Sequence, residues 1–192
     1  MIAIIKYNAG NISSVQNALT RLGCQSIITD EPKEILTADK VIFPGVGEAS
    51  SAMKYLIEKK LDKTILAIKN PMLGICLGQQ LMCEFSEEGN TKCLGIYNTL
   101  VKKFPNTDIV PHMGWNSFTK VDGTLFKNLK TIDNVYFVHS YYAEINEQTT
   151  AVCDYIQPFS AAMQKDNFYA TQFHPEKSAD IGEQILKNFI EI

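Results

Sequence analysis

Cys76 stands between two glycines in the pentapeptide Gly74-Ile75-Cys76-Leu77-Gly78. An apolar run precedes it and a helix-like stretch from Gln79 to Phe85 follows, so a strand-to-helix turn is expected at the cysteine. Side chains at the flanking positions would collide in such a turn, and glycine removes them. The next amide and the helix N-terminus would favour a thiolate at the strand end. The pentapeptide alone also fits a tight turn around a buried, inert thiol.

The far end of the chain supplies a base and an orienting group. Residues Tyr169 to Phe173 predict a strand that runs into His174-Pro175-Glu176. Because the residue before a proline favours extended geometry, His174 and Glu176 are expected to project to the same side. One nitrogen of His174 would accept the proton of Cys76 while Glu176 holds the other nitrogen. Alternatively, His174 could be a strand-end histidine with an ordinary hydrogen bond. A cysteine in the strand-to-helix turn, called the elbow below, and a nearby carboxylate favour the catalytic role.

Acyl transfer by a cysteine also needs two donors that face the oxygen of the tetrahedral intermediate. One is the backbone amide of Leu77. The second is expected from Val46 and Gly47, in the loop Pro44-Gly45-Val46-Gly47 that follows a strand expected over residues 40–43. Carboxyl ends of parallel strands meet at one edge, which would bring this loop to Cys76. The loop lacks the G-x-G-x-x-G and Walker patterns, which argues against a nucleotide-phosphate site.

Alternating strands and helices must position these groups. Short apolar strands are expected over residues 2–5, 26–29 and 40–43, and helices over 11–22, 48–59 and 62–69. The turn signal Asn8-Ala9-Gly10 follows the first strand, Asn11 is expected to cap the first helix, and Gly23 is expected to end it. The pattern predicts an α/β fold with a doubly wound, mostly parallel sheet and helices on both faces.

The second half of the chain follows a different pattern. From about residue 91 to 171, short strands are separated by turn signals, which predicts an antiparallel extension of the same domain. A final helix is expected from Asp180 to Ile192, with Asp180 and Glu183 as a capping pair. At 192 residues the chain is long enough for one substantial core, so a single domain over 1–192 is expected.

Composition excludes several classes of protein. The net charge of −3 offers no broad basic surface for nucleic acid. The five cysteines are odd in number and form no C-x-x-C pair, which argues against a disulfide framework or a zinc site and favours a cytoplasmic location. No basic leader and no apolar stretch near the ~20 residues of a membrane span occur. His112 and His139 lack the spacing of metal ligands, so no metal and no cofactor are expected.

Three motifs together resemble the class I glutamine amidotransferase family, in the same order and along nearly the whole chain. They are Pro44-Gly45-Val46-Gly47, Gly74-Ile75-Cys76-Leu77-Gly78-Gln79-Gln80 and His174-Pro175-Glu176. The resemblance implies a flavodoxin-like sheet and a glutaminase that uses Cys76, His174 and Glu176 without a cofactor. Ammonia would be its second product.

Four further segments resemble the branch of that family that supplies ammonia to a cyclase subunit in histidine biosynthesis. They are Asn8 to Val15, Glu84 to Gly89, Pro111 to Asn116 and Val138 to Tyr141. This resemblance implies a (β/α)8-barrel cyclase as partner. It also implies that the glutamine head is bound by Gln80, Glu88, Ser140 and Tyr141. The residues implied to lie toward the cyclase are Asn11, Trp115, Tyr136, His139 and Lys177.

Two other functions remain possible at this point. The same glutaminase chemistry could serve another synthase, in pyridoxal phosphate assembly or sugar modification, although the Pro111 to Asn116 segment favours histidine biosynthesis. A binding module without catalysis would be expected to have lost at least one of Cys76, His174 and Glu176, and all three are present.

Overall fold

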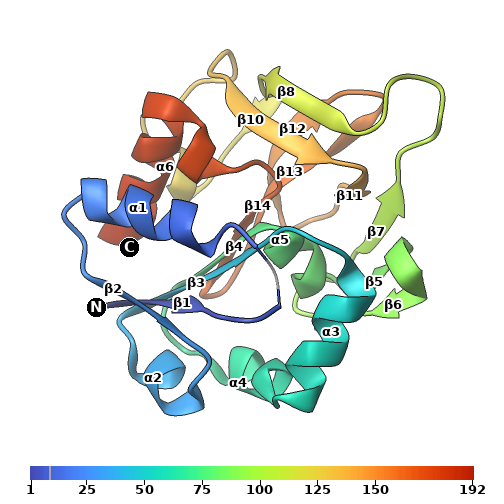
Figure 1. Ribbon diagram of the computed structural model, residues 1–192. Coiled ribbons are helices and arrows are strands. Elements are labelled where there is room, and N and C mark those ends of the chain that lie inside the picture. Colours follow the sequence, from blue (N-terminus) through green and yellow to red (C-terminus); the bar gives the residue numbers. More distant parts are fainter. Residues whose placement is uncertain (9) are drawn as a thin grey trace.

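An eight-stranded sheet forms the centre of the computed structural model, which describes residues 1–8 and 10–192 (Figure 1). Its strand order is β2-β1-β3-β4-β14-β13-β12-β9. Strands from both halves of the sequence therefore lie in one sheet. The turn expected at Asn8-Ala9-Gly10 includes Ala9 and lies outside the described residues.

The parallel part of the sheet contains every strand expected in the first half of the chain. It is formed by β1 (Ile2–Ile5), β2 (Ser26–Thr29), β3 (Lys40–Gly45), β4 (Met72–Cys76) and β14 (Phe168–Thr171). In the register of β3 and β4, Gly45 lies opposite Cys76, and Thr171 of β14 lies opposite Ile75. The carboxyl ends of three strands thus meet at the cysteine, as the sequence predicted.

Helices cover both faces of this sheet (Figure 1). On one face lie α1 (Ile12–Arg21) and α6 (Ala179–Glu191). On the other lie α2 (Pro32–Thr37), α3 (Ala49–Glu58), α4 (Leu61–Ala67) and α5 (Leu77–Met82). Because side chains alternate along a strand, Ile4 joins the core beneath α1 and α6, whereas Ile5 joins the core beneath α2 to α5. The doubly wound prediction is confirmed.

The antiparallel extension is also present. In the main sheet β13 (Pro158–Lys165) pairs with β14 and with β12 (Thr149–Asp154), which pairs with β9 (Lys120–Val121). A separate pair is formed by β8 (His112–Asn116) and β10 (Val135–His139). A four-stranded sheet contains β5 (Phe85–Ser86), β6 (Thr91–Lys92), β7 (Leu100–Lys103) and β11 (Tyr141–Ala143). Short 3-10 turns are η1 (Glu88–Asn90), η2 (Thr124–Phe126) and η3 (Pro175–Lys177).

Two expected helix caps are wrong, and one expected helix end is confirmed. Asn11 precedes α1 but makes no side-chain cap bond and has a left-handed backbone with φ of 71°. Helix α6 begins after Ser178 without a side-chain cap, so Asp180 lies inside its first turn, and Glu183 pairs with Lys187 at 2.9 Å. Helix α1 ends at Arg21, and Gly23 follows with φ of 73°, as a glycine after a helix end commonly does.

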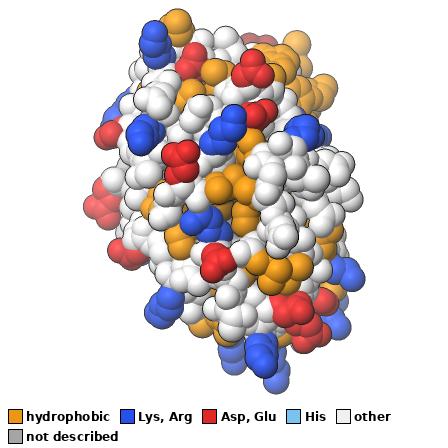
Figure 2. Space-filling view, turned by 90° about the vertical axis from the view of Figure 1, so that its left-hand side faces the viewer, with side chains coloured by type: hydrophobic (Ala, Val, Ile, Leu, Met, Phe, Trp, Pro, Cys, Tyr) orange, Lys and Arg blue, Asp and Glu red, His pale blue; other side chains and the backbone are white. Residues whose placement is uncertain are grey.

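The surface carries both signs of charge. Figure 2 shows acidic and basic side chains interspersed around a central apolar strip on the face that includes α1 and the N-terminus. Among the described residues, no helix combines the length and apolar character that crossing a membrane requires.

Candidate active site

Cys76 occupies a strained turn between β4 and α5. Its φ is 54° and its ψ is −107°, whereas neither flanking glycine has a positive φ. The glycines serve close packing: a Cβ at Gly78 would lie 2.0 Å from the carbonyl oxygen of Phe43, and one at Gly74 would lie 2.5 Å from the sulfur of Met82. The sequence therefore predicted the elbow correctly, but the unusual dihedral belongs to the cysteine, and the strain is of the kind found at functional sites.

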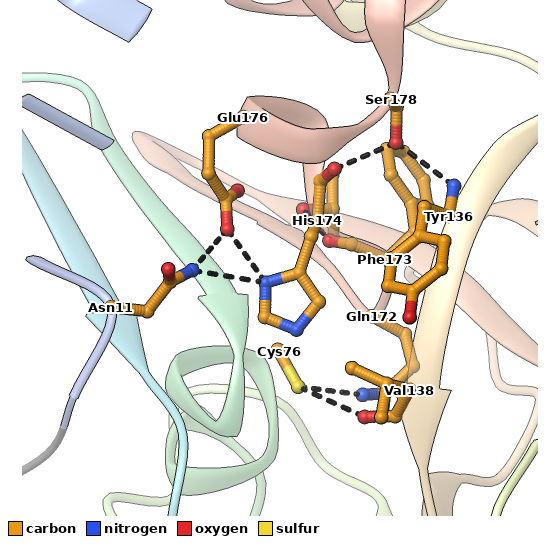
Figure 3. A network of polar contacts seen from close by, with 10 residues as sticks. Asn11, Cys76, Tyr136, Val138, Gln172, Phe173, His174, Glu176 and Ser178 are labelled. Atoms are coloured by element: carbon orange, nitrogen blue, oxygen red, sulfur yellow. Dashed lines mark hydrogen bonds and ion pairs between the residues drawn. The ribbon is translucent and has the colours of Figure 1, made fainter. Parts of the chain in front are cut away.

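His174 and Glu176 meet at the same place. Nδ1 of His174 lies 2.7 Å from Oε1 of Glu176, and both side chains are fully buried. The backbone at His174 is extended, as expected, but Pro175 begins the η3 turn, and this turn folds Glu176 back to the ring. The ring of His174 lies over Cys76, and Nε2 is buried without a hydrogen-bond partner among the described residues (Figure 3). The thiol, the imidazole and the carboxylate thus lie next to one another in the expected order.

The charges of the neighbours decide the protonation of His174. Burial lowers the pKa of His174, but the Cys76 thiolate and the Glu176 carboxylate together raise that pKa to about 10. A pKa this high means that the imidazole holds a proton at neutral pH when the thiolate is present. His174 can therefore act as an acid beside the nucleophile.

The backbone around His174 is clamped by β10. The amide of His174 donates to the carbonyl of Tyr136 at 3.0 Å. The hydroxyl of Ser178 donates to the carbonyl of His174 at 2.6 Å and accepts from the amide of Tyr136 at 2.9 Å (Figure 3). These bonds tie the histidine to a second sheet, so its position does not depend on the main sheet alone.

Asn11 belongs to this group, although sequence reasoning assigned it to a partner surface and a helix cap. Its Nδ2 donates to Oε1 of Glu176 and lies 3.4 Å from Nδ1 of His174 (Figure 3). The left-handed backbone of Asn11 turns its side chain away from α1 and toward the carboxylate. No pattern near Asn11 could have shown this contact, because Glu176 is 165 residues away.

A cavity of about 350 Å³ opens beside Cys76. All three residues expected at the oxyanion hole, Val46, Gly47 and Leu77, line it. Gly47 has a φ of 135°, which favours glycine, and the carbonyl of Val46 accepts from the amide of Gly10 at 3.3 Å. That bond holds the Val46–Gly47 peptide in one orientation.

All four residues expected to bind the glutamine head, Gln80, Glu88, Ser140 and Tyr141, also line the cavity. Gln80 Nε2 donates to the carbonyl of Tyr141 at 2.8 Å and to Oε1 of Gln172 at 2.9 Å. Both amide hydrogens are thereby used, so Oε1 of Gln80 is left to accept from a ligand. Glu88 Oε2 accepts from the amide of Ala49 at 2.8 Å, while burial raises the pKa of Glu88.

Gln172 is a site residue that sequence reasoning missed. It is fully buried next to the triad, and its Nε2 lies 3.6 Å from the sulfur of Cys76 (Figure 3). Its other end accepts from Gln80, so the two glutamines connect the nucleophile with the expected substrate pocket. Gln172 directly follows β14, and no local pattern marks it as a site residue.

The residues expected at a partner surface differ in exposure. Trp115 is 55% exposed, Lys177 is exposed, and Tyr136 is half-buried with its ring 6.1 Å from that of Trp115. Asn11 is half-buried beside the triad. His139 departs from the expectation, because it is 6% exposed and lines the cavity, and so does not offer its side chain to a partner directly.

Comparisons with known proteins agree with this geometry. The chain is 57% identical to a protein named imidazole glycerol phosphate synthase subunit HisH from Bacteroides fragilis strain YCH46, over 100% of this chain and 99% of that protein. It is 52% identical to the protein of the same name from Bacteroides thetaiotaomicron, with the same coverage. A solved protein of Thermoplasma acidophilum, provisionally described as part of a GMP synthase, shares the fold with a TM-score of 0.78 and 20% identity over 100% and 92% of the two chains. The model of the family described as glutamine amidotransferase class-I matches residues 3–192, and the chain belongs to that family.

Proposed function

We propose that this protein hydrolyses glutamine to glutamate and ammonia and supplies the ammonia to a cyclase subunit that makes imidazole glycerol phosphate in histidine biosynthesis. The observation that carries the proposal is the stack of Cys76, His174 and Glu176, in which Nδ1 of the buried His174 lies 2.7 Å from Oε1 of Glu176. The full-length identity to the two named synthase subunits supports the pathway.

In the first half of the reaction, the thiolate of Cys76 attacks the side-chain carboxamide carbon of glutamine. The amides of Leu77 and Gly47 stabilise the oxyanion. Nε2 of the protonated His174 transfers its proton to the leaving nitrogen, the carbon–nitrogen bond breaks, and ammonia and a glutamyl thioester form. Glu176 keeps the ring oriented and stabilises its positive charge.

In the second half, the now neutral His174 accepts a proton from water as the water oxygen attacks the thioester carbonyl. The tetrahedral intermediate collapses, the carbon–sulfur bond breaks, and glutamate leaves. The Cys76 thiolate and the His174 imidazolium are restored, so each cycle consumes one glutamine and one water.

The head of the substrate would occupy the cavity beside Cys76. The free Oε1 of Gln80 and the carboxylate of Glu88 are acceptors suited to the α-ammonium group of glutamine. Ser140 and Tyr141 also line this cavity. Both acceptors reject a ligand that carries a carboxylate in place of the ammonium group.

A second subunit is implied, because the named relatives are subunits of a synthase. We take a cyclase of the (β/α)8-barrel type as this partner. The surface of this chain that would bind the cyclase includes the exposed Trp115 and Lys177, together with Tyr136, whose ring lies beside that of Trp115, and the half-buried Asn11. We also propose that the chain acts as a single domain over 1–192 and in the cytoplasm, where its five free thiols stay reduced.

The proposal is tested by measuring glutamate release under three conditions: the purified chain alone, the chain with a co-expressed barrel cyclase, and both together with the nucleotide ligand of the cyclase. The expected result is glutamine hydrolysis that rises with the cyclase and disappears in Cys76→Ala. Hydrolysis that is indifferent to the cyclase but rises with another synthase would assign the chain to another pathway. No hydrolysis under any condition would leave only a binding role.

A further inference from the structure

Two buried histidines lie side by side at the cavity: His139 lines it, and His112 packs against His139. His112 of β8 and His139 of β10 are paired in the register of the two strands, and they are 3% and 6% exposed. Nδ1 of His112 lies 3.1 Å from Nε2 of His139. The reaction proposed above uses neither ring.

The hydrogen-bond partners determine which nitrogen carries each proton. Nδ1 of His139 lies 2.8 Å from the carbonyl of Tyr141, and because a carbonyl only accepts, this nitrogen donates. In a neutral ring Nε2 of His139 then accepts, so Nδ1 of His112 must donate to it. Nε2 of His112 accepts in turn from Nδ2 of Asn116, at 3.3 Å.

The surroundings keep both rings neutral. Burial lowers the pKa of His139 to about 3 and that of His112 to about 4. Aromatic rings pack around the pair: His112 stacks on Tyr155 with centroids 4.1 Å apart, and His139 contacts Phe159 at 5.1 Å. The positive charge of His174 also opposes protonation of His139. Each ring is therefore one fixed donor and one fixed acceptor.

The chain of hydrogen bonds from Asn116 through His112 and His139, called the relay below, ends on the carbonyl of Tyr141, which also binds Gln80 in the substrate pocket. The oxygen of Tyr141 accepts from His139 on one side and from Nε2 of Gln80 on the other, each at 2.8 Å. Two donors occupy its two lone pairs, so the peptide after Tyr141 cannot turn without breaking a buried bond. Gln80 depends on the same carbonyl to keep its Oε1 toward the cavity.

We propose that His139 and His112 are positioning residues for the glutamine site: they hold the Tyr141 carbonyl, and through it Gln80 and the Ser140–Tyr141 backbone, in the geometry that binds the amino-acid head. The inference rests on the proposed function. It predicts an effect on glutamine affinity and little effect on the chemical step, since neither ring touches Cys76 or His174 in the hydrogen-bond network.

Substitutions at His139 separate a hydrogen-bonding role from simple core packing. In His139→Asn the amide nitrogen takes roughly the place of Nδ1 and can still donate to Tyr141. In His139→Gln the amide takes roughly the place of Nε2 and cannot reach that carbonyl. His139→Gln should raise the KM for glutamine by about 3- to 10-fold, the effect of one lost donor, with kcat nearly unchanged. His139→Asn should stay within about 3-fold of the wild type.

The matched control is Tyr155→Phe, which keeps the ring stacked on His112 and removes only the bond from its hydroxyl to the carbonyl of Ile109, at 2.7 Å. It should leave KM unchanged. Glutamine binding by calorimetry in the Cys76→Ala background measures the same affinity without turnover. Melting temperatures show whether a change in KM follows a loss of folding.

The relay is refuted if the Asn and Gln variants at His139 raise KM equally, or if KM stays constant while both melting temperatures fall. That second outcome would identify ordinary core histidines. Absence of glutamine turnover in the wild type would instead refute the proposed function. If His139→Gln does not fold, His112→Asn and His112→Gln give the same comparison, because only the former keeps a donor toward His139.

Discussion

Replacing Glu176 with glutamine tests how the imidazole is oriented. Oε1 of Glu176 accepts from Nδ1 of His174, at 2.7 Å, and from Nδ2 of Asn11. In Glu176→Gln the amide could place either oxygen or nitrogen there. The NH₂ group of Asn11 selects the oxygen, because two donors would repel. The variant should therefore keep the correct tautomer of His174 and lose only the negative charge.

The size of the effect follows from the two kinds of bond. A hydrogen bond to a charged group contributes roughly 1.5–3 kcal/mol and a neutral one roughly 0.5–1.5 kcal/mol. The difference of about 1 to 2 kcal/mol corresponds to a loss of roughly 10-fold in kcat. Asn11→Ala alone should lose less than about 10-fold, because the carboxylate can accept from His174 with either oxygen.

The double variant should lose far more than the product of the two. Without Asn11 the new amide at position 176 is free to turn its nitrogen toward His174. That would force the wrong tautomer, a defect that costs ~10⁴-fold in serine triads. We expect a loss of at least about 10³-fold in Asn11→Ala/Glu176→Gln.

The assay is kcat for glutamate release with the cyclase saturating, so that altered docking at Asn11 does not enter. The pH dependence of Cys76 alkylation provides a second measure of the ion pair. Additive losses in the double variant, or a 10⁴-fold loss in Glu176→Gln alone, would refute the orienting role of Asn11.

Three further changes have defined outcomes. Gly78→Ala should destabilise the fold by at least about 1–3 kcal/mol in denaturant unfolding, because its Cβ would lie 2.0 Å from the carbonyl of Phe43; a neutral result would contradict the packing. The folded-state pKa values of His112 and His139 lie below the ordinary value for histidine, so the unfolded chain binds more protons than the folded one as the pH falls. The free energy of unfolding should therefore fall from about pH 6.5 toward pH 4, by up to ~1.4 kcal/mol per pH unit per histidine. In urea titrations the double variant His112→Phe/His139→Phe should show a shallower fall. Lys177→Ala should reduce activation by the cyclase more than it changes the melting temperature, and equal activation of wild type and variant would remove Lys177 from the docking surface.

Local patterns were sufficient for every strand of the parallel half and for most of its helices, although the short helix α2 (Pro32–Thr37) was not expected. Apolar strands and period-3.6 helices are local signals, and the chain follows them from β1 to α5. Local signals did not predict the helix caps correctly. Asn11 is a good capping residue type, yet a buried carboxylate at the triad engages its side chain instead. At α6 the cause is local, because the helix begins at Ala179 and so places Asp180 inside its first turn.

The residues around Cys76 also fall into two groups, those with a local sequence signature and those without one. The elbow, the loop over Val46 and Gly47, and the histidine motif each carry a local signature, and the parallel register brings them together. Gln172 and the His112–His139 pair carry none. Their hydrogen bonds join strands far apart in the sequence, and only the three-dimensional arrangement shows that a buried polar side chain has a partner.

Covalent trapping of the nucleophile tests the central claim most directly. A glutamine-derived diazoketone, followed by intact-protein and peptide mass spectrometry, should give one adduct, on Cys76, and none in Cys76→Ala. The other buried thiols are poor nucleophiles, because burial raises the pKa of Cys83 well above its usual range and those of Cys93 and Cys153 to about 12. An adduct on Cys83 or Cys153, or undiminished glutamine hydrolysis by Cys76→Ala, would contradict the assignment of Cys76 as the nucleophile.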